Sequence, residues 1–181
     1  MAVQTRRATV EEFDQFIQRP ENTDKLFEYV GGEIVEVASS NYSSEVAARI
    51  LIEIGISVKS RTMGRVTGAD GGYVVSGERY IPDVAFISKE KQPEPSHEAY
   101  NTTPPDLAVE VLSPSNDPGD IRIKLFNYLR AGTVVWLVDP DKKEVEVYAS
   151  GQAKKLGLDS ILDGGDVLPG FTLPVKEIFP D

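Results

Sequence analysis

Three residues, Asp83, Glu110 and Lys124, have the types and surroundings that metal-assisted chemistry requires. Asp83 begins one apolar run, and Glu110 interrupts a second, Leu-Ala-Val-Glu-Val-Leu. An ionised carboxylate is costly to bury in such a run unless a metal ion, a cation or a shifted pKa compensates. Lys124 is near enough in sequence for the next helix to bring it to Glu110. An aspartate, a glutamate and a lysine that meet at strand ends are the minimum set for metal-assisted hydrolysis of a phosphodiester.

Two strands and one helix are needed to position these side chains. We expect strands over residues 83–88 and 106–112, the second of them central in a sheet. A polar turn then leads to a helix from Ile121 to about Arg130, whose predicted buried face is formed by Ile121, Leu125, Tyr128 and Leu129. Asp120 is expected to be the N-cap of this helix, and the alternative is that it pairs with Lys124 one turn later.

The remaining pattern predicts one α/β domain over residues 1–181, with a mixed sheet and helices on opposite faces. Capping-box spacing at Thr9 predicts a first helix, and an apolar stripe predicts a long helix over about 42–59. Strands are expected over 25–30, 33–37, 134–138, 144–149 and 154–158, the first two as a hairpin around Gly31-Gly32. Two short strands within 64–77 are expected to pair as another hairpin, and the tail from Asp163 is expected to be a loop with an apolar anchor.

Several motifs together resemble the Uma-two family of restriction endonucleases in the PD-(D/E)XK nuclease superfamily. They are Ile81-Pro82-Asp83-Val84-Ala85-Phe86, Ala108-Val109-Glu110-Val111-Leu112-Ser113-Pro114-Ser115, Lys124-Leu125 with Tyr128, Ala131-Gly132, and Leu168-Pro169-Gly170-Phe171. The resemblance implies a restriction-endonuclease-like mixed β-sheet flanked by helices, with additional N-terminal and C-terminal hairpins. It also implies an Mg²⁺- or Mn²⁺-dependent endonuclease that hydrolyses DNA.

The resemblance assigns roles to individual residues. Asp83 and Glu110 would bind the metal, with the backbone carbonyl of Val111 as a further oxygen ligand. The superfamily pattern has a lysine two residues after the glutamate, where this sequence has Leu112. Lys124 would then supply the catalytic charge from the following helix.

Three further acids are candidates for the edge of the site. Glu45 lies in the first turn of the long helix, where it is either an accessory metal ligand, as in the superfamily, or a surface acid stabilised by the helix dipole. Glu28 and Glu33 belong to the first hairpin and are outside candidates for the site edge. The alternative for both is a solvent-facing acid, which we favour for Glu36.

Composition limits the classes of partner. The net charge of −10 argues against an extended basic DNA-binding face, although Lys59, Arg61, Arg65, Arg122 and Lys124 are candidate backbone contacts. The sequence has no cysteine and lacks both an apolar run of membrane-spanning length and a signal peptide. We therefore expect a cytoplasmic protein that does not bind membranes. The single histidine, His97, lies in a polar loop and is expected to be exposed.

Two other functions are compatible with the same residues. The fold could serve as a non-enzymatic interaction or assembly module in which Asp83 and Glu110 are structural, although the position of Glu110 within an apolar run is harder to explain that way. A metal-dependent hydrolase that acts on another substrate is the third reading, supported by the acidic net charge. Several short strands and an apolar tail segment that is expected to be exposed also lead us to expect a homodimer.

Overall fold

A six-stranded mixed sheet forms the centre of the computed structural model, which describes residues 7–180. Its strand order is β11-β10-β9-β8-β6-β3, with β3 Gly64–Thr67, β6 Val84–Ser88, β8 Leu107–Val111, β9 Val134–Asp139, β10 Glu144–Ala149 and β11 Gln152–Leu156. Strands β8 and β9 are parallel, and the other neighbours are antiparallel. The parallel pair requires a crossover, which is helix α3, Pro118–Arg130.

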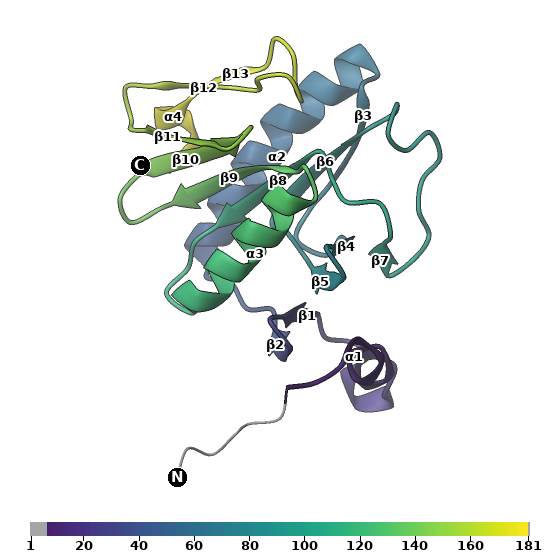
Figure 1. Ribbon diagram of the computed structural model, residues 1–181. Coiled ribbons are helices and arrows are strands. Elements are labelled where there is room, and N and C mark those ends of the chain that lie inside the picture. The colour runs from purple at the N-terminus through teal and green to yellow at the C-terminus, as the bar shows by residue number, and fades with distance from the viewer. Residues whose placement is uncertain (1–6, 181) are drawn as a thin grey trace.

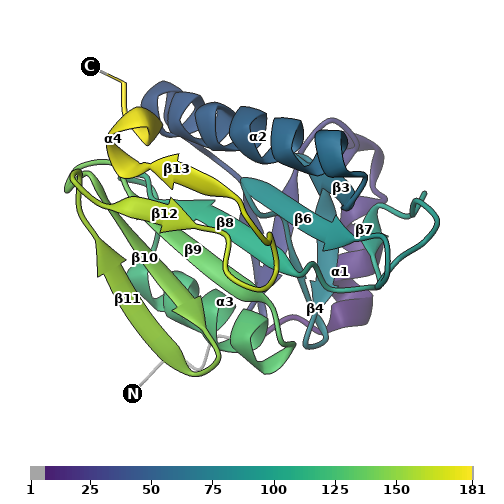
Figure 2. The same ribbon diagram turned by 90° about the horizontal axis from the view of Figure 1, so that it is seen from above.

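Helices cover both faces of this sheet, as expected from the sequence (Figures 1 and 2). Helix α2, Asn41–Arg61, lies on one face together with the C-terminal elements β12 Ile161–Asp163, β13 Thr172–Pro174 and α4 Val175–Ile178. Helix α3 lies on the other face. Alternation along β8 explains the division, because Leu107 and Val109 belong to the core beneath α2, whereas Ala108 packs in the core that contains Tyr128 of α3.

A second sheet lies on the α3 side and carries the N-terminal hairpin. Its order is β2-β1-β5-β4-β7, with β1 Phe27–Val30, β2 Glu33–Glu36, β4 Gly72–Val75, β5 Glu78–Tyr80 and β7 Tyr100–Asn101. Helix α1, Val10–Ile17, begins with the predicted capping box at Thr9, and a short 3₁₀ helix, Pro20–Asn22, follows it. Phe13 of α1 packs against Tyr29 of β1, with ring centroids 5.8 Å apart.

The predicted α/β class, with mixed sheets flanked by helices, is confirmed. The predicted hairpin within 64–77 is wrong, because β3 pairs with β6 and β4 pairs with β5 in the other sheet. Gly64 permits the first pairing, since a Cβ there would lie 2.1 Å from the carbonyl oxygen of Ile87. The segment between β3 and β4 therefore crosses from one sheet to the other.

The tail also differs from the prediction of a loop. Strands β12 and β13 pair with each other, and Leu162 lies opposite Leu173. Both side chains are buried with Phe171 and Trp136 in the core beneath α2. Among the described residues, no helix combines the length and the apolar character that crossing a membrane demands.

Candidate active site

The ends of two neighbouring strands bring Asp83 and Glu110 together. Val84 of β6 pairs with Val109 of β8, so Asp83 and Glu110 are the next residues along the two antiparallel strands. The Asp83 carboxylate accepts a hydrogen bond from the backbone N–H of Val111, with a donor–acceptor distance of 2.7 Å. Because the N–H and C=O of one extended residue point to the same strand edge, the carbonyl of Val111 also faces the Asp83 side.

Helix α3 delivers Lys124 and Tyr128 to Glu110. The side chain of Glu110 points to the α3 face, and its Oε2 lies 2.8 Å from Nζ of Lys124. The hydroxyl of Tyr128, four residues later and so on the same helix face, donates to Oε1 of Glu110 at 2.9 Å. The ammonium of Lys124 also lies over the Tyr80 ring, 5.6 Å from its centroid.

The buried face of α3 is more polar than its apolar spacing predicts. Lys124, Asn127 and Tyr128 are buried, Ile121 and Leu125 are half-buried, and the predicted core residue Leu129 is exposed. Glu110 and the small sheet supply hydrogen-bond partners to this face, which makes burial of polar side chains tolerable. The N-cap of α3 is Asp117 and not Asp120, because Oδ1 of Asp117 accepts from the backbone N–H groups of Gly119 and Asp120.

Glu28 of β1 is the residue whose position the sequence reasoning underestimated. Its two carboxylate oxygens lie 2.8 and 3.1 Å from Nζ of Lys124, and Oε1 also accepts from the backbone N–H of Ile81 at 2.6 Å. Glu28 is therefore central and not at the edge. The available signal was its place inside the apolar run Leu26-Phe27-Glu28-Tyr29-Val30, which is the same pattern that marks Glu110.

Burial and mutual repulsion control the protonation of the acids. Burial raises the pKa of Glu110 to about 7, with Lys124 acting in the opposite direction and Glu28 and Asp83 adding to the rise. Burial also raises the pKa of Asp83, although the hydrogen bond from the N–H of Val111 and the charge of Lys124 both act to lower it. Burial alone would lower the pKa of Lys124, but the carboxylates of Glu110 and Glu28 outweigh it and raise that pKa. The lysine is thus a fixed cation among acids that repel each other.

These side chains line a pocket of about 220 Å³ with a strong excess of acid. Six of the lining residues are acids and one is a base: Glu28, Glu36, Asp83, Glu110, Asp117 and Asp120 against Lys124. In residues 7–180 no group of three or more His, Cys, Asp or Glu side chains is arranged to hold a metal ion. A bound metal would therefore depend on two carboxylates, the Val111 carbonyl and water.

The donor set nevertheless fits a hard divalent cation. Mg²⁺ is commonly bound through one or two carboxylates and keeps several waters. Each carboxylate oxygen has two lone pairs, so an oxygen of Glu110 that accepts one hydrogen bond retains acceptor capacity. The excess of acid over base in the pocket also favours a dipositive ion.

Two of the acids considered from the sequence lie outside this pocket. Glu45 is exposed, forms a surface ion pair with Arg49 at 3.2 Å, and does not line the pocket. Glu33 is exposed and is not a lining residue either.

The candidate DNA-contacting arginines near the end of α2 make structural contacts. Arg61 donates to the backbone carbonyls of Pro169 and Gly170, and Arg65 donates to those of Gln92 and Pro93. The bonds of Arg61 tie the C-terminal segment to α2, and those of Arg65 tie the loop after β6 to β3. His97 is exposed in that loop, as expected.

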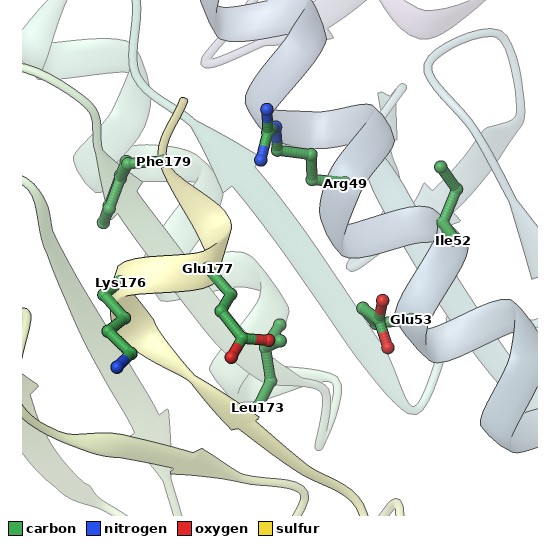
Figure 3. A pocket seen from close by; sticks show the side chains of 7 residues that line it. All are labelled: Arg49, Ile52, Glu53, Leu173, Lys176, Glu177 and Phe179. Carbon is green, nitrogen blue, oxygen red and sulfur yellow. The ribbon is translucent and has the colours of Figure 1, made fainter. Parts of the chain in front are cut away.

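A larger hollow, of about 560 Å³, lies between α2 and α4 and contains none of the predicted site residues (Figure 3). Its charged side chains are of both signs: Arg49 and Lys176, Glu53 and Glu177. It lacks the buried acids and the strand-end carbonyl that the pocket at Asp83 offers. We therefore place the candidate site at Asp83 and Glu110.

Comparison with known proteins supports the fold described above. The crystal structure of a protein from Anabaena variabilis ATCC 29413, described as "a putative nuclease belonging to DUF820", superposes with a TM-score of 0.80 at 22% sequence identity. The match covers 92% of this chain and 96% of that one. No curated protein matches the sequence. The Uma2 family model, described as "Putative restriction endonuclease", matches residues 10–176, and the chain therefore belongs to the Uma2 family.

Proposed function

We propose that this protein is a divalent-metal-dependent endonuclease that hydrolyses DNA phosphodiester bonds. The observation that carries the proposal is the acidic pocket, where Asp83, Glu110 and the Val111 carbonyl face the same space as Lys124. Membership of a family described as restriction endonucleases supports DNA as the substrate. The nuclease description of the Anabaena protein, which shares the fold, is consistent with that choice.

In the proposed reaction, a water oxygen bonds to phosphorus and one P–O ester bond breaks. The attacking water gives up a proton to solvent, and the leaving oxygen takes a proton from solvent, which yields a phosphomonoester and a hydroxyl. Asp83, Glu110 and the Val111 carbonyl would hold Mg²⁺ or Mn²⁺. That ion, when bound, supplies an acidified water and stabilises charge on the phosphate. Lys124 acts as a point charge beside the phosphate, a role suited to a compact ammonium.

The first prediction is cleavage of DNA that depends on added Mg²⁺ or Mn²⁺ and stops in EDTA. Plasmid and single-stranded substrates, followed on gels, measure it. Mn²⁺ should also raise the midpoint of thermal unfolding, because a ligand that binds the folded chain stabilises it. Cleavage should weaken with rising salt along a shallow slope, since the pocket lining contains one basic residue.

A non-enzymatic module is the second candidate, and one observation favours it. Lys124 forms ion pairs with both Glu28 and Glu110, so these three buried side chains can stabilise one another as a structural cluster that needs no ligand. Absence of both Mn²⁺ binding and cleavage would support the module and overturn the endonuclease. Mn²⁺ binding without DNA cleavage would instead favour a metal-dependent hydrolase that acts on another substrate.

We also propose the homodimer expected from the sequence, and place its interface at the hollow between α2 and α4 (Figure 3). Ile52 of α2 lines it and is 57% exposed, and Ile56, one turn further along the helix, is 61% exposed. In a two-fold dimer, the basic side chains of one copy could face the acidic side chains of the other. Light scattering at micromolar concentration should give twice the mass of one chain, and Ile52→Glu should return the single-chain mass. A wild type with the mass of one chain would contradict the dimer.

A further inference from the structure

We propose that Glu28 is a positioning residue that fixes both Lys124 and the strand segment carrying Asp83. The inference rests on the proposed function, because it assigns Glu28 a role in the same site. The observation behind it is that one carboxylate bonds two parts of the chain at once. Glu28 contacts the ammonium of Lys124 with both oxygens and accepts the backbone N–H of Ile81.

The bond to Ile81 reaches the segment that leads into β6. Ile81 and Pro82 are buried and lie directly before Asp83. The 2.6 Å bond therefore restrains the chain two residues from the proposed metal ligand. At its other side, Asp83 is restrained by the N–H of Val111. Glu28 and β8 together hold Asp83 from two directions.

The bonds to Lys124 determine where its charge lies. If Glu110 were its only partner, the flexible four-carbon side chain of Lys124 could place its ammonium at several positions around that one carboxylate. Glu28 also contacts Nζ, so the ammonium is held between β1 and β8, with Nζ 2.8 and 3.1 Å from the two Glu28 oxygens and 2.8 Å from Oε2 of Glu110. This arrangement keeps the charge at one place along the pocket wall.

The hairpin that carries Glu28 is itself fixed against α3. Its turn has left-handed backbone at Gly31, where a Cβ would lie 2.8 Å from the side chain of Ile123. The N–H of Gly31 donates to Glu78 of β5 at 2.9 Å. The turn therefore packs closely on the helix that carries Lys124, and this packing fixes the position of Glu28 relative to Lys124.

The test replaces Glu28 with glutamine and observes the lysine directly. The side-chain ¹⁵N–H signal of Lys124, assigned by its loss in Lys124→Met, should be visible in the wild type because the ammonium is buried and hydrogen-bonded. In Glu28→Gln it should broaden or disappear, because glutamine keeps one accepting oxygen but loses the second acceptor and the negative charge that hold the ammonium. Glu33→Gln makes the same change at an exposed position of the same hairpin and should leave the signal unchanged.

Two further measurements separate positioning from other roles. In Glu28→Gln, kcat for DNA cleavage should fall by roughly 100-fold, the effect of a small misplacement, with KM nearly constant. Mn²⁺ affinity, measured by calorimetry, should stay within about threefold of the wild type because Glu28 is not a metal ligand in this scheme. Glu28→Asp keeps the charge and shortens the side chain, so it provides a second folded variant that should also lose rate.

The outcomes distinguish this inference from the proposed function. An unchanged Lys124 signal in both Glu28 variants overturns the positioning role, whatever the cleavage results. Loss of Mn²⁺ binding in Glu28→Gln also overturns it: the glutamine oxygen can still accept from the N–H of Ile81 and so hold the Asp83 segment, and Glu28 would then be a ligand. If the Lys124 signal is lost in Glu28→Gln and the wild type binds Mn²⁺ but cuts no DNA, the placement of Lys124 by Glu28 is supported while the endonuclease proposal fails.

Discussion

Replacing Lys124 with methionine should lower the free energy of unfolding by roughly 3–5 kcal/mol near neutral pH, the cost of removing one partner from a buried ion pair. Methionine keeps most of the side-chain length, so the change removes mainly the charge. It leaves Glu28 and Glu110, which are 8% and 7% exposed, without their shared cation. Urea unfolding in EDTA measures the difference, with Lys25→Met as the control. Lys25 belongs to an exposed ion pair with Glu36, and its loss should cost less than about 1 kcal/mol.

The destabilisation should depend on pH in a defined direction. In the folded wild type the pKa of Glu110 is about 7, above its usual 4.5, so its contribution to stability is present below pH 4.5 and is lost as the pH rises through 7. Lys124 opposes that rise, and without it the pKa of Glu110 goes higher still. The difference between wild type and Lys124→Met should therefore begin to grow near pH 7, where Glu110 ionises in the folded wild type, and should increase further above that pH. A cost below about 1 kcal/mol at every pH would contradict the buried cluster.

The loss of stability expected for Lys124→Met is larger than the sequence alone would predict. From the sequence, Lys124 is a catalytic charge on a helix, and its removal should cost rate alone. The contact with Glu28 changes that, since one lysine now compensates two buried carboxylates from strands distant in sequence. Local spacing predicts which residues share a helix face. It does not predict that a hairpin formed 96 residues earlier supplies the second acid.

The parts predicted correctly depend on short-range pattern. The apolar runs around Asp83 and Glu110 indicate adjacent buried strands, and the stripe of α2 indicates a helix packed on a sheet. The errors concern pairing between elements. Strand β3 is compatible with either neighbour by its sequence, and its pairing with β6 depends on the close backbone approach at Gly64. The tail forms strands because Leu162 and Leu173 have an apolar core to cover, which is a property of the whole fold.

The burial of Glu28 follows the same logic. A single acid within an apolar run on a hairpin is compatible with a solvent-facing side chain, and only the position of α3 decides otherwise. Once α3 crosses between β8 and β9, Lys124 reaches Glu28 of β1, and Tyr128 reaches Glu110 of β8. The acid then has partners that offset the cost of its burial. Acids within apolar runs therefore merit equal weight, whether or not a motif includes them.

Asp83→Asn should abolish most activity while leaving the fold intact. Asparagine keeps an oxygen that can accept from the N–H of Val111, so the link between β6 and β8 is preserved. The lost negative charge removes one of the two proposed carboxylate ligands. A metal contributes several kcal/mol to transition-state stabilisation, and each 1.36 kcal/mol is tenfold in rate. We expect cleavage to fall by roughly 10³-fold and Mn²⁺ affinity by at least about tenfold, measured by gel assay and calorimetry.

The other end of the same strand pair provides the matched control for this change. Asp106 accepts from the backbone N–H of Ser88 at 2.7 Å, as Asp83 accepts from Val111, and it too links β6 to β8. Asp106 forms an ion pair with Lys91 and does not line the acidic pocket. Asp106→Asn should therefore lower the free energy of unfolding at least as much as Asp83→Asn does. It should leave Mn²⁺ affinity and cleavage unaltered. Equal Mn²⁺ affinity in the wild type and Asp83→Asn would show that Asp83 is not a ligand, and cleavage that survives in Asp83→Asn would point to a contaminating nuclease.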